Sequence, residues 1–377
     1  RFPAKMFIDC TFEGDLMAAA GVEYFVGREA NSKYGEDYNG FRATNAANGH
    51  RFHSKVDPYK VKGDKSSGLL KFVSSEPPLA DGVEDKKVQA YNFRLCLTKV
   101  PENRVQIEKP EGYNPDDFEL AARYFEAESN AFPLIISSIP NGKTDVNNRN
   151  AISTDFIGGN YEWPEASYER RAEIFKAHLD YHKKLLYFFQ NDPRVPEKIR
   201  NEIAKYGLAK DEFASTGHWP FNLYIREARR MVGEYVMTQH DCQNTRLTPR
   251  PVGMGSYTLD SHNTSRYVTR EGYVQNEGDV QVGLNAPYKI AYGSIIPKKA
   301  QAENLFVPVA SSASHIAYGS IRMEPVFMIL GQSAATAAVQ AIDDKCAVQD
   351  VDYAKLSKTL ERDGQILNLS VQTANAK

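Results

Sequence analysis

Three polar side chains that could do chemistry lie close together on one predicted strand. Tyr91, Asn92 and Arg94 fall within residues 88–98, whose alternating apolar side chains are typical of a strand. A guanidinium on a buried strand costs free energy unless it pairs with a carboxylate or binds a ligand. We therefore weigh Arg94 equally as half of a structural ion pair and as a ligand contact, with Tyr91 as a candidate catalytic group beside it.

Histidines are the candidates for proton transfer. His218 lies in a Gly-His-Trp-Pro turn before a predicted helix, and such loop positions suit acid–base chemistry. His315 lies in a loop of small residues, where it could contact a ring or a substrate, or be a hydrogen-bonded loop histidine. The helix predicted over residues 223–240 carries three arginines, which more often form a salt-bridged face than a binding site.

Carboxylates surround the end of the first predicted strand. Residues 5–10 are predicted to form a short buried strand, and Asp9, Glu13 and Asp15 lie at or just after its end. Such a group could hold Mg²⁺, although we favour no metal here. Because a lone strand cannot satisfy its backbone, its sheet neighbours must come from later in the chain or from residues upstream.

The most informative stretch is residues 303–338. An apolar strand leads through a loop of small residues, 311–320, to a long helix that begins near Pro325. The free amides and positive dipole end of this helix favour negative charge, such as that at the edge of a reduced flavin ring. The same pattern equally describes a close-packed strand–loop–helix unit that binds nothing.

These residues are positioned by an expected mixture of helices and strands. Apolar stripes and end signals predict five further segments as helices. They are residues 16–21, 114–130, 164–190, 196–206 and 352–362. Residues 141–160 are polar and are predicted to form a loop.

The amino-acid composition limits the classes of binding partner that we expect. The net charge is −2 with no basic block, so binding to nucleic acid through phosphate contacts is not expected. No apolar stretch of membrane-spanning length is expected, and four scattered cysteines show no metal spacing. The 21 tyrosines and 19 phenylalanines suit a pocket for a planar or sugar-like ligand, or simply a well-packed core. Cytoplasmic and exported locations both remain open.

Several motifs together resemble the FAD-dependent oxidoreductases related to glutathione reductase and fumarate reductase, and in particular a bacterial group sometimes labelled xanthan-lyase-related. The motifs are Phe7-Ile-Asp-Cys-Thr-Phe-Glu-Gly-Asp-Leu16, Val88-Gln-Ala-Tyr-Asn-Phe-Arg-Leu-Cys96, Pro140-Asn-Gly-Lys-Thr-Asp145, Arg226-Glu-Ala-Arg-Arg-Met-Val-Gly-Glu-Tyr235 and Ser314-His-Ile-Ala-Tyr-Gly-Ser-Ile-Arg-Met-Glu-Pro325. The resemblance covers essentially the whole chain and implies FAD as the cofactor. It implies two groups of cofactor-binding residues: Asp9, Thr11, Glu13 and Asp15, and Ser314, Gly319, Ser320, Arg322 and Pro325.

The resemblance also implies an α/β fold with two parts. Residues 1–30 and 286–345 would belong to a three-layer FAD/NAD(P)-binding domain, and residues 31–285 to an inserted, largely helical α+β substrate domain, with residues 346–377 as a C-terminal helix and tail. Relatives usually begin with a strand–GxGxxG–helix unit, which these residues lack, so the binding domain is expected to be incomplete at its N-terminus. The nearest candidate, Gly253-Met-Gly255, lacks the third glycine.

The leading functional hypothesis is hydride transfer between FAD and a polar organic substrate, with a sugar-like compound as its narrower form. One alternative is a non-redox carbohydrate lyase or hydrolase that uses His218, Tyr91 and Arg94. Another is a non-catalytic fragment of a flavoprotein. The expected partner is a small molecule, and a homo-oligomer remains open.

Overall fold

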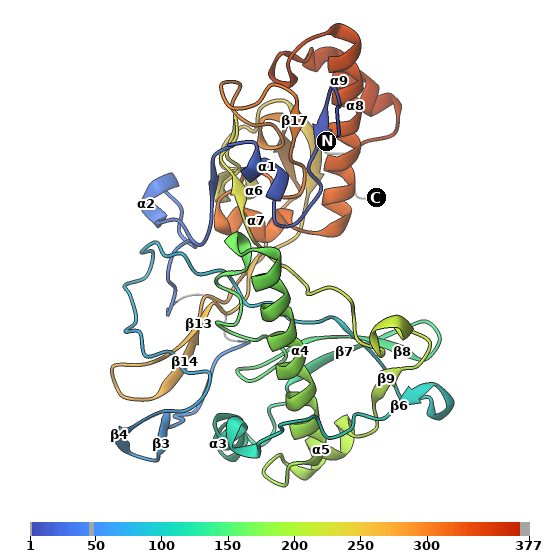
Figure 1. Cartoon of the computed structure of the whole chain (residues 1–377). Helices are drawn as coiled ribbons and strands as arrows, with labels where there is room; N and C mark the ends of the chain where they lie inside the picture. The colour runs from blue at the N-terminus through green and yellow to red at the C-terminus, as the bar shows by residue number, and fades with distance from the viewer. Residues whose placement is uncertain (1, 45–48, 370–377) are drawn as a thin grey trace, which may run out of the picture.

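The computed structural model describes residues 2–44 and 49–369, which form an upper and a lower body in the view of Figure 1. The upper body holds both ends of the described chain, and the lower body holds the long helix α4 (Tyr168–Asn191). Each body has its own hydrophobic core. The two cores explain why one chain of this length forms two packed units.

The upper body begins with β1 (Phe7–Ile8), which pairs in parallel with β17 (Leu305–Phe306). The neighbour of the first strand therefore comes from almost 300 residues later in the chain, one of the two sources that the sequence allowed. Short antiparallel pairs and helices complete this body. They are α1 (Asp15–Ala19), β2 (Tyr24–Phe25) with β10 (Arg230–Met231), α6 (Gln239–Cys242), β11 (Pro251–Gly255) with β16 (Tyr288–Ala291), β12 (Leu259–Ser261) with β15 (Val280–Val282), α7 (His315–Ile321), α8 (Glu324–Asp344) and α9 (Tyr353–Arg362).

The lower body is built on a five-stranded antiparallel sheet against α4. Its strands, in spatial order, are β6 (Arg104–Val105), β9 (Gly207–Ala209), β5 (Leu95–Thr98), β8 (Lys143–Asn148) and β7 (Leu134–Ile139). Helix α2 (Asn31–Tyr34) lies beside the upper body, where His240 of α6 contacts the backbone oxygen of Gly35. The remaining elements are β3 (Tyr59–Val61), β4 (Asp64–Leu69), α3 (Glu119–Ala127), α5 (Glu197–Ile203), β13 (Ser265–Val268) and β14 (Val274–Glu277). Because this body combines a sheet with helices, it is α+β rather than mainly helical.

Several predicted elements are confirmed. The apolar run with a proline in its first turn forms α8, and the segment after Asp352 forms α9 with the Asp352 carboxylate capping it. The predicted helices at 164–190, 114–130, 196–206 and 16–21 correspond to α4, α3, α5 and α1 with shifted ends. The mixture of helices and strands agrees with the expected α/β class in its coarse form.

Four local predictions were wrong. Residues 223–240 are largely irregular rather than helical, because successive arginines in this segment reach different buried carboxylates. Residues 141–160 contain strand β8, and residues 311–320 contain most of helix α7. The strand predicted over 88–98 is formed only from Leu95 onward.

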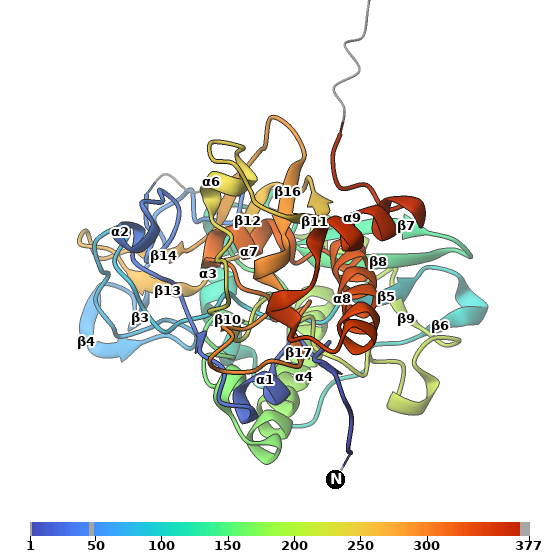
Figure 2. The same ribbon diagram turned by 90° about the horizontal axis from the view of Figure 1, so that it is seen from above.

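The domain boundaries stay a prediction, but core packing divides the middle of the chain. The buried residues Met237, Cys242, Val252 and Leu259 pack with the upper core, Val274 on β14 packs with the lower core, and Val280 on β15 packs with the upper core again. By length and composition, helix α8 is apolar enough to span a membrane, although no such stretch was expected from the sequence. Half of its most apolar segment is buried inside the protein. Figure 2 shows the upper elements gathered around α8 and α7.

Candidate functional site

A cleft opens where the turn between β1 and α1 meets the lower body. It consists of one cavity of about 620 Å³ and a second of about 260 Å³, which share five lining residues. The shared residues are Phe12, Phe221, Asn222, Leu223 and Ile225. The larger cavity is also lined by Trp163 and Arg171, and the smaller by Arg94 and Tyr224.

The turn after β1 is held by its own carboxylate. Asp9 accepts hydrogen bonds from the amide and hydroxyl of Thr11 and from the amide of Met17, so its oxygens are already engaged. Gly14 adopts a φ of +65°, where a Cβ would lie 3.0 Å from the Cβ of Ala310. The glycine thus permits the tight turn that carries Thr11 and Glu13 to the cleft.

Two arginines hold this turn, and one of them comes from α4 of the lower body. The Asp15 carboxylate pairs with Arg171 of α4 at 2.6 Å and with Arg229 at 2.6 Å. The hydrogen bond from Arg171 is the main cause that lowers the pKa of Asp15. Glu13 accepts a hydrogen bond of 3.1 Å from the Trp163 indole. These contacts fix the width of the cleft by tying its two walls together.

The structure brings Arg94 to the cleft. Its Nε donates to Asp145 at 3.0 Å, its Nη2 also pairs with Asp145, and its guanidinium carbon lies 5.2 Å from the Tyr224 ring centroid. About a third of each side chain in the ion pair is exposed. Burial opposes the charge of Arg94, but the Asp145 hydrogen bond and carboxylate raise its pKa overall. Arg94 therefore forms an ion pair and lines a cavity at once.

The other three catalytic candidates lie elsewhere. Tyr91 is fully buried, and its hydroxyl donates to the backbone oxygen of Glu227. His315 is also buried in α7. His218 has a φ of 71° and contacts the backbone oxygen of Glu212 at 3.1 Å, while its neighbours line a separate cavity of about 420 Å³. No hydrogen bond joins any two of the four candidates within the described residues.

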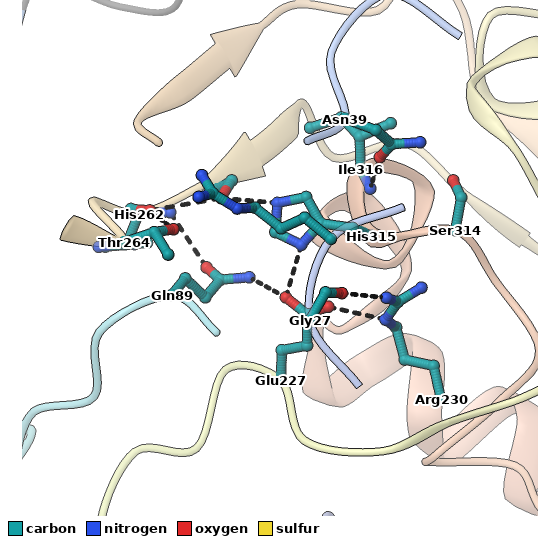
Figure 3. Close-up of polar contacts among 12 residues, drawn as sticks. Gly27, Asn39, Gln89, Glu227, Arg230, His262, Thr264, Ser314, His315 and Ile316 are labelled. Carbon is teal, nitrogen blue, oxygen red and sulfur yellow. Dashed lines mark hydrogen bonds and ion pairs between the residues drawn. The ribbon is translucent and has the colours of Figure 1, made fainter. Parts of the chain in front are cut away.

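His315 belongs to a buried network centred on Glu227 (Figure 3). Glu227 accepts hydrogen bonds from His315 Nδ1 at 2.8 Å and from Gln89 at 2.9 Å, and it pairs with Arg230 at 2.7 Å. Burial raises the pKa of Glu227, but His315 and Arg230 outweigh it and lower that pKa to about 2. Arg230 also pairs with Glu29. Because this network spans distant parts of the chain, it fixes the upper body beside the cleft.

The backbone amides at the start of α7 already donate hydrogen bonds to side chains of the protein. The amide of Ile316 donates to the side chain of Asn39 (Figure 3). The amide of His315 donates to Glu29, and the Ser314 hydroxyl caps the helix. Farther along, a Cβ on Gly319 would overlap the backbone oxygen of Asp260. Contacts within the protein therefore explain why a serine stands at position 314 and a glycine at position 319.

The remaining predicted cofactor residues differ in exposure. The Ser320 hydroxyl bonds to Tyr288 and to the backbone of Tyr257, and the Arg322 guanidinium pairs with Asp260 at 2.6 Å. Pro325 is exposed in the first turn of α8, where no side chain caps the helix. The rings of Phe12 and Phe327 lie 6.0 Å apart, which brings this end of α8 beside the cleft.

Sequence reasoning missed most of the cleft wall. Phe12, Phe221 and Tyr224 come from loops or irregular segments, where no periodicity marks a binding residue. Among the described residues, no group of histidine, cysteine and acidic side chains is placed to hold a metal ion. The acidic residues after β1 instead engage backbone amides and arginines.

Comparison with known proteins identifies the family. No curated protein and no solved structure gives a significant match. The family model described as FAD dependent oxidoreductase matches residues 1–360, almost the whole chain. The parts that carried the resemblance, including the turn after β1 and the α7–α8 segment, lie within this match. The chain therefore belongs to the FAD dependent oxidoreductase family.

Proposed function

We propose that this protein transfers a hydride between a polar organic substrate and FAD in the cleft beside the β1–α1 turn. Membership of the family supports FAD as the cofactor and a flavin redox role. The single structural observation in favour of this location is the aromatic cleft formed by Phe12, Trp163 and Phe221. When bound, FAD supplies a ring that accepts or returns a hydride.

The lining residues fit a flat ring with polar edges. Phe12 and Phe221 are 40% and 64% exposed, so they offer aromatic surface that a planar group would cover. Arg171 and Arg94 each place one guanidinium in the wall, suited to electron-rich oxygen or nitrogen atoms. Thr11 and Glu13 add polar groups from the turn. These are the residues that would hold the ring and exclude water from it.

The substrate would enter the smaller cavity. Tyr224 lines it, and the guanidinium carbon of Arg94 lies 5.2 Å from the centroid of the Tyr224 ring. Aromatic walls also stack against sugar rings, which is the support for a sugar-like substrate as the narrower form of this proposal.

The proposed roles of His218, Tyr91 and His315 in catalysis stay predictions. The non-redox alternative needs His218, Tyr91 and Arg94 to act on one substrate. The Tyr91 hydroxyl is buried and already donates to a carbonyl, so no observation favours that alternative.

Anaerobic reduction tests the proposed function. The purified chain is saturated with FAD, freed of oxygen and mixed with a panel of alcohols, hydroxy acids and sugars, while the flavin absorbance near its visible maximum is followed. The proposal expects at least one compound to bleach the bound flavin faster than it bleaches free FAD. If dithionite bleaches the bound flavin but no organic donor or acceptor exchanges electrons with it, the proposed function is wrong.

A further inference from the structure

The smaller cavity has an uneven chemical character. Its volume is about 260 Å³, and Phe12, Phe213, Phe221, Leu223 and Ile225 make most of its wall apolar. Among the described lining residues, Arg94 is the one with a charge. A cavity of this kind favours a ligand with an apolar body and a single anionic group.

The Arg94 guanidinium is oriented to bind an anionic group of a ligand. Its Nε and Nη2 are engaged by Asp145, whereas its Nη1 has no hydrogen-bond or ion-pair partner among the described residues. The Tyr224 ring lies under the guanidinium, and a second guanidinium, that of Arg226, lies 5.3 Å from the same ring. The ring and Asp145 therefore hold the Arg94 plane in one orientation and leave one N–H edge free.

Two further charged side chains act around Arg94. Arg226 is buried and pairs with Asp155 at 3.0 Å, so it cannot swing out to replace Arg94. Glu324, at the start of α8, is the further carboxylate whose charge acts on Arg94. A neutral polyol would leave the free N–H edge without a charged partner and would cover the apolar wall poorly.

We propose that the substrate of this enzyme carries a carboxylate on an apolar or aromatic body, and that Arg94 binds the carboxylate while Asp145 positions Arg94. The assignment of this cavity to the substrate rests on the proposed function. It narrows the substrate from polar organic compounds in general to organic acids, and it admits a sugar only as a sugar acid.

Binding of matched probes tests this proposal without turnover. Benzoate and the neutral benzamide have nearly the same shape, and each is titrated by calorimetry into the purified chain, with and without saturating FAD. A charge-assisted contact predicts that benzoate binds about tenfold or more tightly than benzamide. It also predicts that benzoate affinity, but not benzamide affinity, falls as salt is added. Equal affinities for the two probes would overturn the proposal.

Variants identify the residue responsible. Arg94→Gln is expected to remove the preference for benzoate, and Arg94→Lys to keep part of it. Arg194→Gln is the matched control, because Arg194 pairs with Asp192 through the same two nitrogens, is a third exposed, and lines neither cavity. A preference that survives Arg94→Gln would refute the role of Arg94. The salt dependence of the unmodified protein decides the matter if this variant does not fold.

The two proposals fail in different ways. If benzoate selectivity depends on Arg94 but no compound exchanges electrons with the flavin, the redox function is wrong and the anion site stands. If neutral donors reduce the flavin equally well in the unmodified protein and in Arg94→Gln, the redox function stands and the carboxylate site is wrong.

Discussion

Replacing Glu227 by glutamine removes the central charge of the buried network. The amide would keep the size of the side chain, but it has one accepting oxygen in place of two and carries no charge to pair with Arg230, so it cannot replace both the contact with His315 and the ion pair. The pKa of Glu227 falls from an ordinary 4.5 to about 2 in the folded protein. That difference corresponds to about 3 kcal/mol of stabilisation of the charged form.

The shift in the pKa of Glu227 sets the expected loss of folding stability. Glu227→Gln is expected to lower the free energy of unfolding at pH 7 by about 3 kcal/mol, in the range found when a buried ion pair loses one partner. For a chain of this size, that corresponds to a melting temperature about 4 °C lower. Differential scanning calorimetry measures the shift, and Glu126→Gln, which removes an exposed ion pair with Lys62, is the control with no expected change.

The destabilisation caused by Glu227→Gln should become smaller as the pH falls. Because the folded pKa of Glu227 is depressed, its stabilisation is present above about pH 4.5 and is lost as the pH falls toward 2. The difference between the unmodified protein and Glu227→Gln should therefore shrink as the pH is lowered from 5 toward 3. Equal melting temperatures at pH 7, or a difference that grows in acid, would refute this account of the network.

Three further perturbations test the walls of the site. Gly319→Ala should destabilise the upper body because its Cβ would overlap the Asp260 backbone, whereas Gly331→Ala on α8 has open space and should be neutral or slightly stabilising in thermal melts. Asp15→Asn should leave two guanidiniums without their carboxylate, and faster hydrogen exchange of the amides after β1 would reveal the loosened turn. Phe12→Ala should weaken FAD binding measured by equilibrium dialysis, and unchanged affinity would remove this ring from the site.

The sequence predicted the elements whose signals are local. Helix α8 follows from an apolar run with a proline at its start, and α9 from its Asp352 cap. The segment at 223–240 could not be predicted in this way, because its backbone is set by ion pairs such as Arg226 with Asp155, about 70 residues away in the sequence. Tertiary pairing outweighed local helix propensity there.

Only some residues of the candidate cleft were selected from the sequence. Arg94 was selected as a costly arginine on a strand, and Thr11 and Glu13 were selected through the resemblance. All three line the cleft, and their roles as ligand contacts stay predictions. Ser314 and Gly319 were selected through the resemblance, and the structure gives them a helix cap and a close backbone packing. The spacing of residues cannot distinguish a close approach to a ligand from a close approach to the protein's own backbone.

A pair of matched variants tests whether FAD binds in the cleft beside the β1–α1 turn. Phe221 in the cleft and Phe2 outside it are both exposed, so each can be changed to aspartate at little cost to the fold. FAD binding is measured from the perturbation of the flavin absorbance spectrum during titration. We expect saturable binding that Phe221→Asp weakens by about tenfold and Phe2→Asp leaves unchanged, as the loss of an aromatic contact and an added like charge predict. Equal FAD affinity in both variants would contradict the placement of the flavin in this cleft.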